Sequence, residues 1–160
     1  MAKTKAPEVA GGERVITVNR KAFHDYHIDE QIEAGIVLRG TEIKSVREGR
    51  VNLRDAYARI ENGELWLIGA HISPYAHSGS YFNHEPDRPR KLLVHRRELD
   101  YLREKTEARG MTLVPVRLAL RKGRAKVDIG IARGKKLYDK RESLAERDAR
   151  RAVERALREQ

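Results

Sequence analysis

The sequence predicts a mainly β protein with short helices. An OB-fold-like closed antiparallel barrel of about six strands and three helices precedes a C-terminal tail that becomes helical on binding. Three observations lead to this fold class. Apolar residues alternate with polar ones along several segments, as in strands with one buried face. Gly, Pro and Asn punctuate these segments. The chain has 160 residues with a hydrophobic content of 39%, enough for one modest core.

A short helix and a long strand are the first predicted elements. Asn19 can cap a helix that runs to about Tyr26. The segment 26–38 then reads as a half-buried strand, because its apolar residues share one parity. These residues are Ile28, Ile32, Ala34, Ile36 and Leu38. Gly35 inside this strand predicts a bend or a bulge, as barrels need where a strand turns a corner.

The middle of the chain predicts a helix, two strands and a loop. Residues 40–49 begin and end with glycine and fit one or two helical turns. Residues 51–60 and 64–72 are strand-like, and the Asn-Gly pair between them is typical of a hairpin turn. Residues 73–90 contain three prolines and no periodicity, which predicts a mobile or ligand-binding loop.

The last part of the predicted barrel contains one helix and three strands. Residues 91–94 form a short apolar strand, and residues 95–109 form a helix that ends at Gly110. Strands over residues 111–120 and 125–132 follow, joined by a basic hairpin turn. The hairpin signals predict that most strands pair antiparallel.

The chain divides into three predicted regions: a flexible leader over residues 1–14, the barrel over 15–133, and a basic, amphipathic tail over 134–160. Apolar residues recur at helical spacing in the tail but are mostly alanine, so the apolar stripe is too thin to bind strongly to a core. We therefore expect a tail that is disordered alone and becomes helical in contact with RNA. The alternative is an ordinary C-terminal helix docked on the barrel.

Positive charge is concentrated in one stretch of the chain. The net charge is +10, and residues 88–136 carry 16 Lys/Arg against five Asp/Glu. A local field of this kind attracts polyanions such as nucleic acid and accelerates encounter with them. A solubilising surface is the plain alternative. An anionic membrane is disfavoured, because the basic residues interleave with strands and lack the apolar face of a membrane-surface helix.

Composition argues against several classes of protein. Without cysteine, neither a disulfide nor a cysteine-based zinc site can form, which fits a cytoplasmic location. No apolar run approaches the roughly 20 residues of a membrane span, and the first residues lack an apolar signal core. Walker loops, dinucleotide fingerprints and nucleophile elbows are absent. We expect no catalytic residue, no metal and no cofactor, and a monomer because coiled-coil heptads are missing.

Short motifs follow one another in a distinctive order between residues 19 and 141. They are Asn19-Arg20-Lys21-Ala22, His24-Asp25-Tyr26, Glu33-Ala34-Gly35-Ile36-Val37-Leu38, Gly40-Thr41-Glu42-Ile43-Lys44-Ser45, Arg90-Lys91-Leu92-Leu93, Arg97-Glu98-Leu99, Lys126-Val127, Gly130-Ile131-Ala132-Arg133-Gly134-Lys135-Lys136 and Asp139-Lys140-Arg141. No single motif is decisive. Together they resemble the family of small protein B, the tmRNA-binding (SsrA-binding) protein of bacterial trans-translation.

The resemblance implies an RNA-binding protein of ribosome rescue. Members of the family bind the tRNA-like domain of tmRNA and take it to ribosomes stalled on messages without a stop codon. The C-terminal tail occupies the vacant decoding centre and mRNA channel. The implied partners are therefore tmRNA, the small-subunit rRNA of the stalled ribosome and, indirectly, the elongation factor that delivers aminoacyl-tRNA.

Two sets of residues are candidates for RNA contact. The first set binds tmRNA: Asn19, His24, Tyr26, Glu33, Lys91, Leu93, Lys126, Arg133, Lys135 and Lys136. The second set is the decoding-centre tail: Gly134, Tyr138, Asp139, Lys140 and Arg141. Cationic side chains can neutralise phosphate, and aromatic ones can stack on bases. The resemblance places Asn19, Glu33 and Leu93 at binding positions, and puts Tyr138 where the family often has a titratable histidine.

Structural alternatives stay open for several candidates. Asn19 is also a helix cap, Glu33 can hold a nearby arginine or a backbone N–H instead of a base or ribose, and Leu93 is equally plausible in the core. His24 and Tyr26 can be ordinary half-buried residues. The residues of the basic turn either contact phosphate or only make the turn soluble; they are Arg121, Lys122 and Arg124.

Two other functions compete with tmRNA binding. A generic OB-type protein binds single strands or ribosomal RNA without selecting tmRNA. A ribonuclease would use histidine, for which His24 and His27 are candidates. A metal centre needs a stronger constellation than these two histidines supply.

Overall fold

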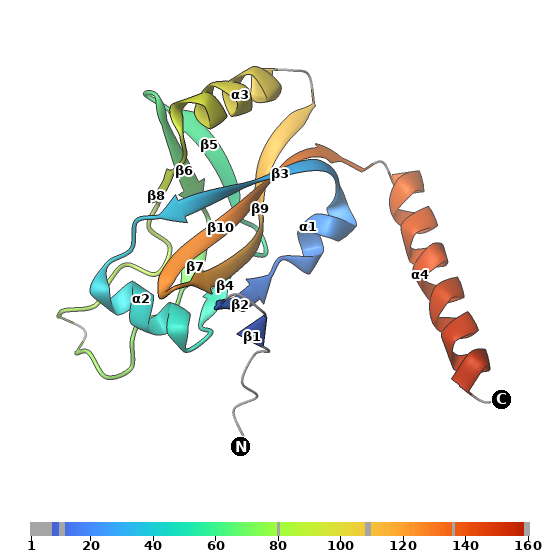
Figure 1. The fold of residues 1–160 in the computed structure, drawn as a ribbon, viewed down its shortest axis with the longest axis horizontal. Coiled ribbons are helices and arrows are strands. Elements are labelled where there is room, and N and C mark those ends of the chain that lie inside the picture. Colours follow the sequence, from blue (N-terminus) through green and yellow to red (C-terminus); the bar gives the residue numbers. More distant parts are fainter. Residues whose placement is uncertain (1–7, 10–11, 80, 108–109, 136, 159–160) are drawn as a thin grey trace.

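A ring of six antiparallel strands lies at the centre of the molecule (Figure 1). The computed structural model describes residues 8–9, 12–79, 81–107, 110–135 and 137–158, with the backbone alone at 8–9 and 137–143. Around the ring the strands follow in the order β9 (Met111–Arg121), β10 (Arg124–Gly134), β3 (Tyr26–Ile36), β8 (Arg90–Leu93), β6 (Glu64–Ile68) and β5 (Tyr57–Glu61). The ring closes where Ala58 of β5 pairs with Leu113 of β9.

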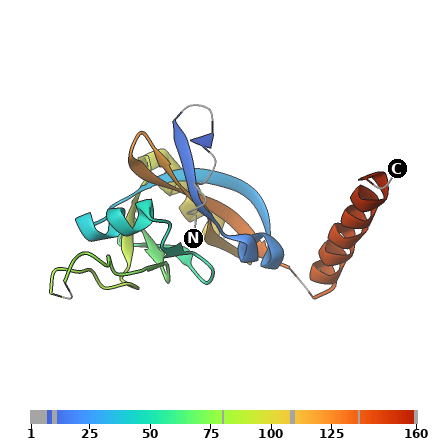
Figure 2. The same cartoon turned by 90° about the horizontal axis from the view of Figure 1, so that it is seen from below.

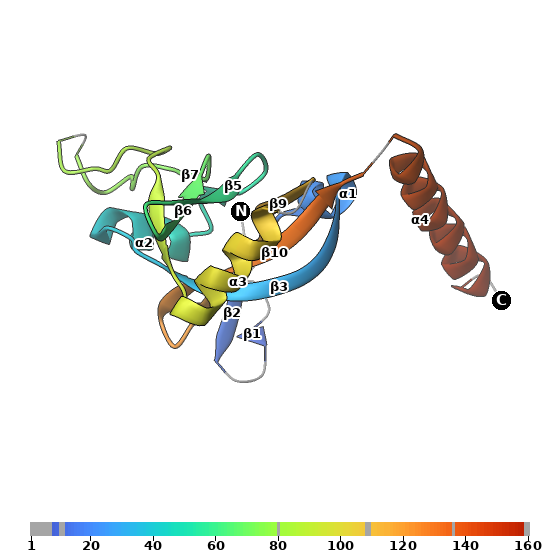
Figure 3. The same ribbon diagram turned by 90° about the horizontal axis from the view of Figure 1, so that it is seen from above.

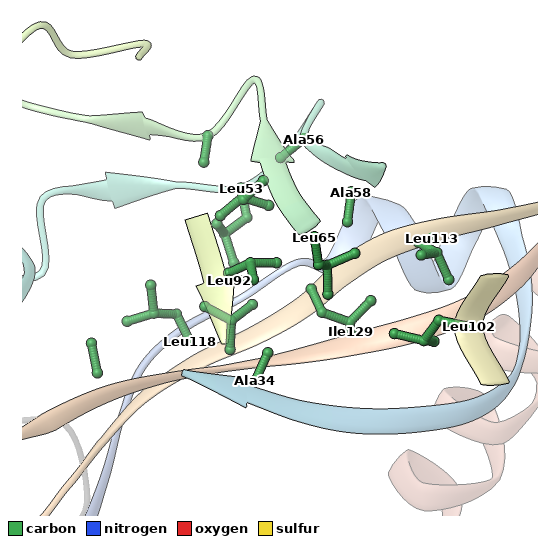
Figure 4. Packing of buried hydrophobic residues seen from close by; sticks show 14 of the residues in the cluster. Ala34, Leu53, Ala56, Ala58, Leu65, Leu92, Leu102, Leu113, Leu118 and Ile129 are labelled. Carbon is green, nitrogen blue, oxygen red and sulfur yellow. The ribbon is translucent and has the colours of Figure 1, made fainter. Parts of the chain in front are cut away.

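The hydrophobic core fills the inside of this ring (Figure 4). Alternation along each strand sends every second side chain inward, so Ala34, Leu92, Leu113 and Ile129 are buried there. Every strand pairing among the described residues is antiparallel. The prediction of a mainly β fold with a few helices is confirmed.

Within the described ranges, four helices accompany the strands: α1 (Arg20–Asp25), α2 (Gly40–Arg47), α3 (Arg96–Glu107) and α4 (Leu137–Arg158). Helix α1 packs Ala22 against the outward valines of β9, and α3 places Leu99 and Leu102 in the main core. Helix α4 projects away from the ring in all three views (Figures 2 and 3). In the part of the chain that is described, no helix is both long and apolar enough to cross a bilayer.

Two strands lie near the N-terminus, and both begin within residues 1–14, the region expected to be a flexible leader. Strand β2 (Glu13–Val18) pairs with β9 outside the ring, and β1 (Glu8–Val9) pairs with β2. Glu13 forms an ion pair with Arg117 at 2.9 Å, and Ile16 packs against the core. The run Val15-Ile16-Thr17-Val18 is β-branched, as is typical of a strand. Its partner, β9, lies about a hundred residues along the chain.

The two strands predicted over residues 51–60 and 64–72 are each broken in two. Strands β4 (Val51–Asn52) and β7 (His71–Ile72) pair with each other in a separate small sheet, apart from β5 and β6. Gly69, which has a φ of +79°, turns the chain between β6 and β7. An alternating pattern does not show such a change of direction, because both pieces of the strand keep the same period.

Gly35 does not form the bulge that was one of its predicted roles. It pairs with Lys126 in β10 and with Leu93 in β8 without a register shift. The shift between β3 and β10 falls instead between Ile131 and Ala132.

Candidate nucleic-acid interface

Three neighbouring strands bring Glu33, Leu93 and Lys126 together on the outer face of the ring. Gly35 of β3 lies between Lys126 of β10 and Leu93 of β8. Because successive side chains alternate between the two faces of a strand, Leu93 is 53% exposed while Leu92 is buried. The alternative that Leu93 belongs to the core is therefore wrong.

Two adjoining hollows mark this surface. The first, of about 320 Å³, reaches the carboxylates of Glu33 and Glu98. The second, of about 350 Å³, extends toward Arg124. Gly35, Leu93 and Lys126 line both. We call the two hollows together the β3 groove; it has acidic side chains at one end and basic ones at the other.

The carboxylate of Glu33 forms an ion pair with Arg121. Oε2 of Glu33 lies 3.1 Å from Nη2 of Arg121, and Oε1 accepts a hydrogen bond from Nη1 at 3.3 Å. Arg121 also lies 3.6 Å from Glu13, which pairs with Arg117. A 2.8 Å hydrogen bond to Asp128 raises the pKa of Arg117 above its ordinary value. The alternative that Glu33 holds an arginine is confirmed, while its contact with RNA stays a prediction.

The two lysines predicted on the ring differ in their surroundings. Lys91 pairs with Glu64 at 3.0 Å and lines neither hollow of the β3 groove. Lys126 has no ion pair with any described residue and lines both hollows. Lys126 is thus the better placed of the two to neutralise a phosphate.

Asn19 is buried and fully used by the fold. Its side chain is 4% exposed, and its Oδ1 accepts a hydrogen bond from the backbone N–H of Ala22 at 3.2 Å. Its Nδ2 donates to the carbonyl oxygens of Leu53 and Pro115, each at 2.9 Å. The helix-cap role is confirmed. Asn19 holds α1, β9 and the chain after β4 together, which positions their exposed neighbours.

The other predicted residues near α1 are partly tied to the protein. Nδ1 of His24 lies 2.9 Å from Oδ1 of Asp25, and Tyr26 packs half-buried against the cluster under α1. Nε of Arg133 lies 3.5 Å from a carboxylate oxygen of β3. Lys135 donates from its backbone N–H to the Asp25 carbonyl at 2.8 Å. The structure thus gathers these residues beside α1, separately from the β3 groove.

A basic hollow beside Asn19 contains residues that sequence reasoning did not select. Its volume is about 360 Å³, and Arg20, Lys21 and Arg54 line it. Nζ of Lys21 donates a 2.6 Å hydrogen bond to Asp55, and this bond lowers the pKa of the Asp55 carboxyl below its ordinary value. Arg20 and Lys21 stand within a motif noted in the sequence, but nothing in the sequence links them to residues 54 and 55, which only the fold brings near.

The tail residues are described only in part. Gly134 ends β10, and Lys136 lies outside the described residues. Tyr138, Asp139, Lys140 and Arg141 stand in the first turns of α4, where the backbone alone is described. Further along α4 the apolar side chains are exposed rather than packed on the ring: Leu144, Val153 and Leu157. This exposure does not favour a docked helix. The structure shows this part of the tail as a helix, and the expectation that it becomes helical only on binding stays a prediction.

The described residues contain no group of three or more His, Asp and Glu side chains arranged to hold a metal ion. His84, the one buried histidine among them, is used by the fold: Nδ1 lies 2.8 Å from Oγ1 of Thr41 and Nε2 lies 2.9 Å from the Ile72 carbonyl oxygen. The β3 groove and the residues gathered beside α1 present a charged, partly apolar surface that is suited to binding.

The chain is similar to proteins described as SmpB or as SsrA-binding proteins. Residues 16–159 match the family model of the SmpB protein. The SsrA-binding protein of Roseiflexus castenholzii is 64% identical over 149 residues, which cover 93% of this chain and 94% of that protein. The SsrA-binding protein of Carboxydothermus hydrogenoformans is 62% identical over 146 residues, covering 91% and 97%. A solved structure described as "tmRNA-SmpB: a journey to the center of the bacterial ribosome" matches with a TM-score of 0.65 and 51% identity, covering 77% of this chain and 85% of that one.

Proposed function

Because the chain belongs to the SmpB protein family, we propose that it binds SsrA RNA, or tmRNA, in trans-translation on the bacterial ribosome. The relatives are SsrA-binding proteins, and the match to this chain covers nearly their whole length. The observation that carries the proposal is the β3 groove, where Glu33, Leu93 and Lys126 meet although they stand far apart in the sequence. The role is one of binding, without a chemical step.

The ring of strands acts as an OB-type closed barrel that holds the tRNA-like domain of tmRNA. Its outer face supplies shape and hydrogen-bonding groups, which folded RNA requires. Its basic side chains supply attraction that is sensitive to salt. The protein works in the cytoplasm as a monomer, delivering tmRNA to ribosomes stalled on messages without a stop codon.

The tail, including Tyr138, Asp139, Lys140 and Arg141, occupies the decoding centre and mRNA channel of the small subunit. Exposure of Leu144, Val153 and Leu157 on α4 supports a helix that is free to meet a partner. Tyr138 can stack on a base there, but it has no imidazole with which to transfer a proton near neutral pH.

A competition experiment tests the RNA partner. We expect tight binding to the tRNA-like fragment of tmRNA and weak binding to an unrelated single strand of equal length at moderate salt. Equal affinities would instead favour a generic single-strand or rRNA binder. Prolonged incubation of tmRNA with the protein tests the ribonuclease alternative, and we expect the RNA to stay intact. Cleavage that is lost in His24→Ala or His27→Ala would support a ribonuclease.

A further inference from the structure

The hairpin turn between β5 and β6 consists of an asparagine followed by a glycine. Asn62 and Gly63 both have positive φ, at 51° and 74°, as a two-residue type I′ turn requires. The last strand pair is Glu61 with Glu64, so the N–H of Gly63 belongs to neither strand. Both turn residues are exposed, and a Cβ built on Gly63 would meet nothing within 4 Å. The backbone nitrogen that follows Asn62 is therefore uncrowded.

The chain has four asparagines, and the fold engages the side chains of the other three. Asn19 is buried and hydrogen-bonded through both its Oδ1 and its Nδ2. Oδ1 of Asn52 accepts a hydrogen bond at 2.9 Å from a backbone N–H two residues along the chain. Asn83 accepts from the backbone N–H of Tyr75 at 3.1 Å and donates to the carbonyl oxygen of Tyr75 at 2.9 Å. The side chain of Asn62 has no hydrogen bond to any residue that the structure describes.

An unbonded side-chain amide next to an uncrowded backbone nitrogen allows an intramolecular reaction. The nitrogen of Gly63 attacks Cγ of Asn62, and the new N–Cγ bond replaces the bond from Cγ to Nδ2. The amide nitrogen leaves as ammonia with the proton of the Gly63 N–H, and a five-membered succinimide ring remains. Glycine favours this attack, because it has no Cβ to crowd the nitrogen and it permits wide backbone rotation. Water then opens the ring at one of its two carbonyl groups.

We propose that Asn62 is a site of spontaneous deamidation in the folded protein. Ring opening at Cγ gives aspartate, and ring opening at the backbone carbonyl gives isoaspartate, in which the main chain runs through the former side chain. Aspartate fits the turn, because Asp-Gly is also a type I′ pair. Isoaspartate does not fit, because it adds one methylene to the main chain. A two-residue turn of that length no longer aligns Glu61 with Glu64.

The effect of isoaspartate reaches the core through the hairpin. Leu65 and Leu67 of β6 are buried, and Ala58 of β5 closes the ring against Leu113. Because the turn sets the register of the two strands, a longer turn strains these contacts. We expect the isoaspartate form to melt about 5 °C or more below the unmodified protein. Asn62→Asp adds the charge without lengthening the chain, so it should melt within about 2 °C of wild type.

Ageing of the full-length protein tests the proposal. The protein is kept at neutral pH below its melting temperature, and its asparagine-containing peptides are then compared by mass spectrometry. The peptide with Asn62 should exchange an NH₂ group for OH, and an isoaspartyl methyltransferase with labelled S-adenosylmethionine should methylate it. The reaction should be less than about tenfold slower than in urea-unfolded protein, because an exposed hairpin tip opens readily. Deamidation in urea alone would show that the folded turn protects Asn62 and would overturn the proposal.

Two variants identify the modified residue. Asn62→Gln should abolish methylation, because a glutamine side chain must close a six-membered ring, which forms far more slowly. Asn52→Gln is the matched control, because Asn52 is also exposed and stands at the end of a strand, and it should leave methylation unchanged. Methylation that persists in Asn62→Gln, or that is lost in Asn52→Gln, would place the reaction elsewhere and overturn the proposal.

Discussion

One buried carboxylate, that of Glu42, holds the long loop before β8 to the ring. Its Oε1 accepts hydrogen bonds from the backbone N–H of Arg39 and from Arg88, and its Oε2 accepts from Nε of Arg90 at 2.7 Å. Arg90, itself fully buried, donates to the carbonyl oxygens of Ala70 and of the loop. Burial raises the pKa of Glu42, but the hydrogen bonds from Arg88, Arg39 and Arg90 outweigh it and hold the pKa below its ordinary value.

Glu42→Gln should destabilise the protein by about 3–5 kcal/mol at pH 7, because it leaves the buried Arg90 charge without its partner. The folded-state pKa is lowered, so the carboxylate stabilises the fold fully above its ordinary pKa of 4.5 and loses this effect as pH falls through the folded-state pKa. The stability difference from wild type should therefore shrink below about pH 4.5. Urea unfolding at neutral and acid pH measures it, with Glu61→Gln as an exposed control. A difference that did not change with pH would contradict this account.

Leu92 and Leu93 are a matched pair of side chains on opposite faces of β8. Leu92→Ala should cost about 2–5 kcal/mol of stability, because it opens a cavity in the core. Leu93→Ala should cost less than about 1 kcal/mol, because the side chain is half in water, yet it should weaken tmRNA-fragment binding more than any other single change on β8. Thermal unfolding and fragment titration of both variants compare the two effects. A reversal of the two stability costs would place the strand in the other register.

At the scale of elements, long-range pairing decides what short patterns leave open. Strand β2 pairs with β9, and its Glu13 forms ion pairs with Arg117 and Arg121 of that strand. The hairpins were easier to predict: the turn between β5 and β6 uses Asn62 with a φ of 51°, and the turn between β9 and β10 uses Lys122 with a φ of 50°. Local turn chemistry is visible in the sequence, whereas the partner of an edge strand is not.

Removal of residues 1–12 and of residues 1–18 should have different effects. The shorter deletion keeps β2 whole, so we expect the melting temperature to stay within a few degrees of wild type. The longer deletion removes β2 and the contact of Ile16 with the core, and exposes the edge of β9. It should lower stability by about 2 kcal/mol or more and promote aggregation. Equal melting temperatures for both deletions would show that β2 contributes nothing to the fold.

At the scale of the whole molecule, the two parts that we propose to bind RNA differ in charge. Residues 88–136 hold most of the positive excess, and residues 137–160 carry seven Lys/Arg against six Asp/Glu. Helix α4 projects away from the ring of strands (Figure 1). Attraction to RNA and entry into the ribosome are therefore expected to depend on different parts of the chain.

Truncation after Lys135 should separate these two activities. It keeps the contact of Lys135 with the end of α1 and removes α4. We expect affinity for the tRNA-like fragment to change less than about threefold, or under 1 kcal/mol, while tagging of peptides on stalled ribosomes is abolished. Fragment titration and a reconstituted tagging assay measure the two effects. Loss of both together would mean that the tail belongs to the RNA-binding surface.

Four features could be predicted from the sequence: the antiparallel, mainly β fold, the Asn19 cap, the hairpin turns and the site of the basic excess. Each of these depends on neighbouring residues, through alternation, capping or backbone conformation. Three others required the folded chain: Glu33 is held by Arg121, Leu93 faces water, and Gly35 lies between Leu93 and Lys126. These facts depend on strand register and on partners far along the chain, and a one-residue change of register would exchange the two faces of every strand.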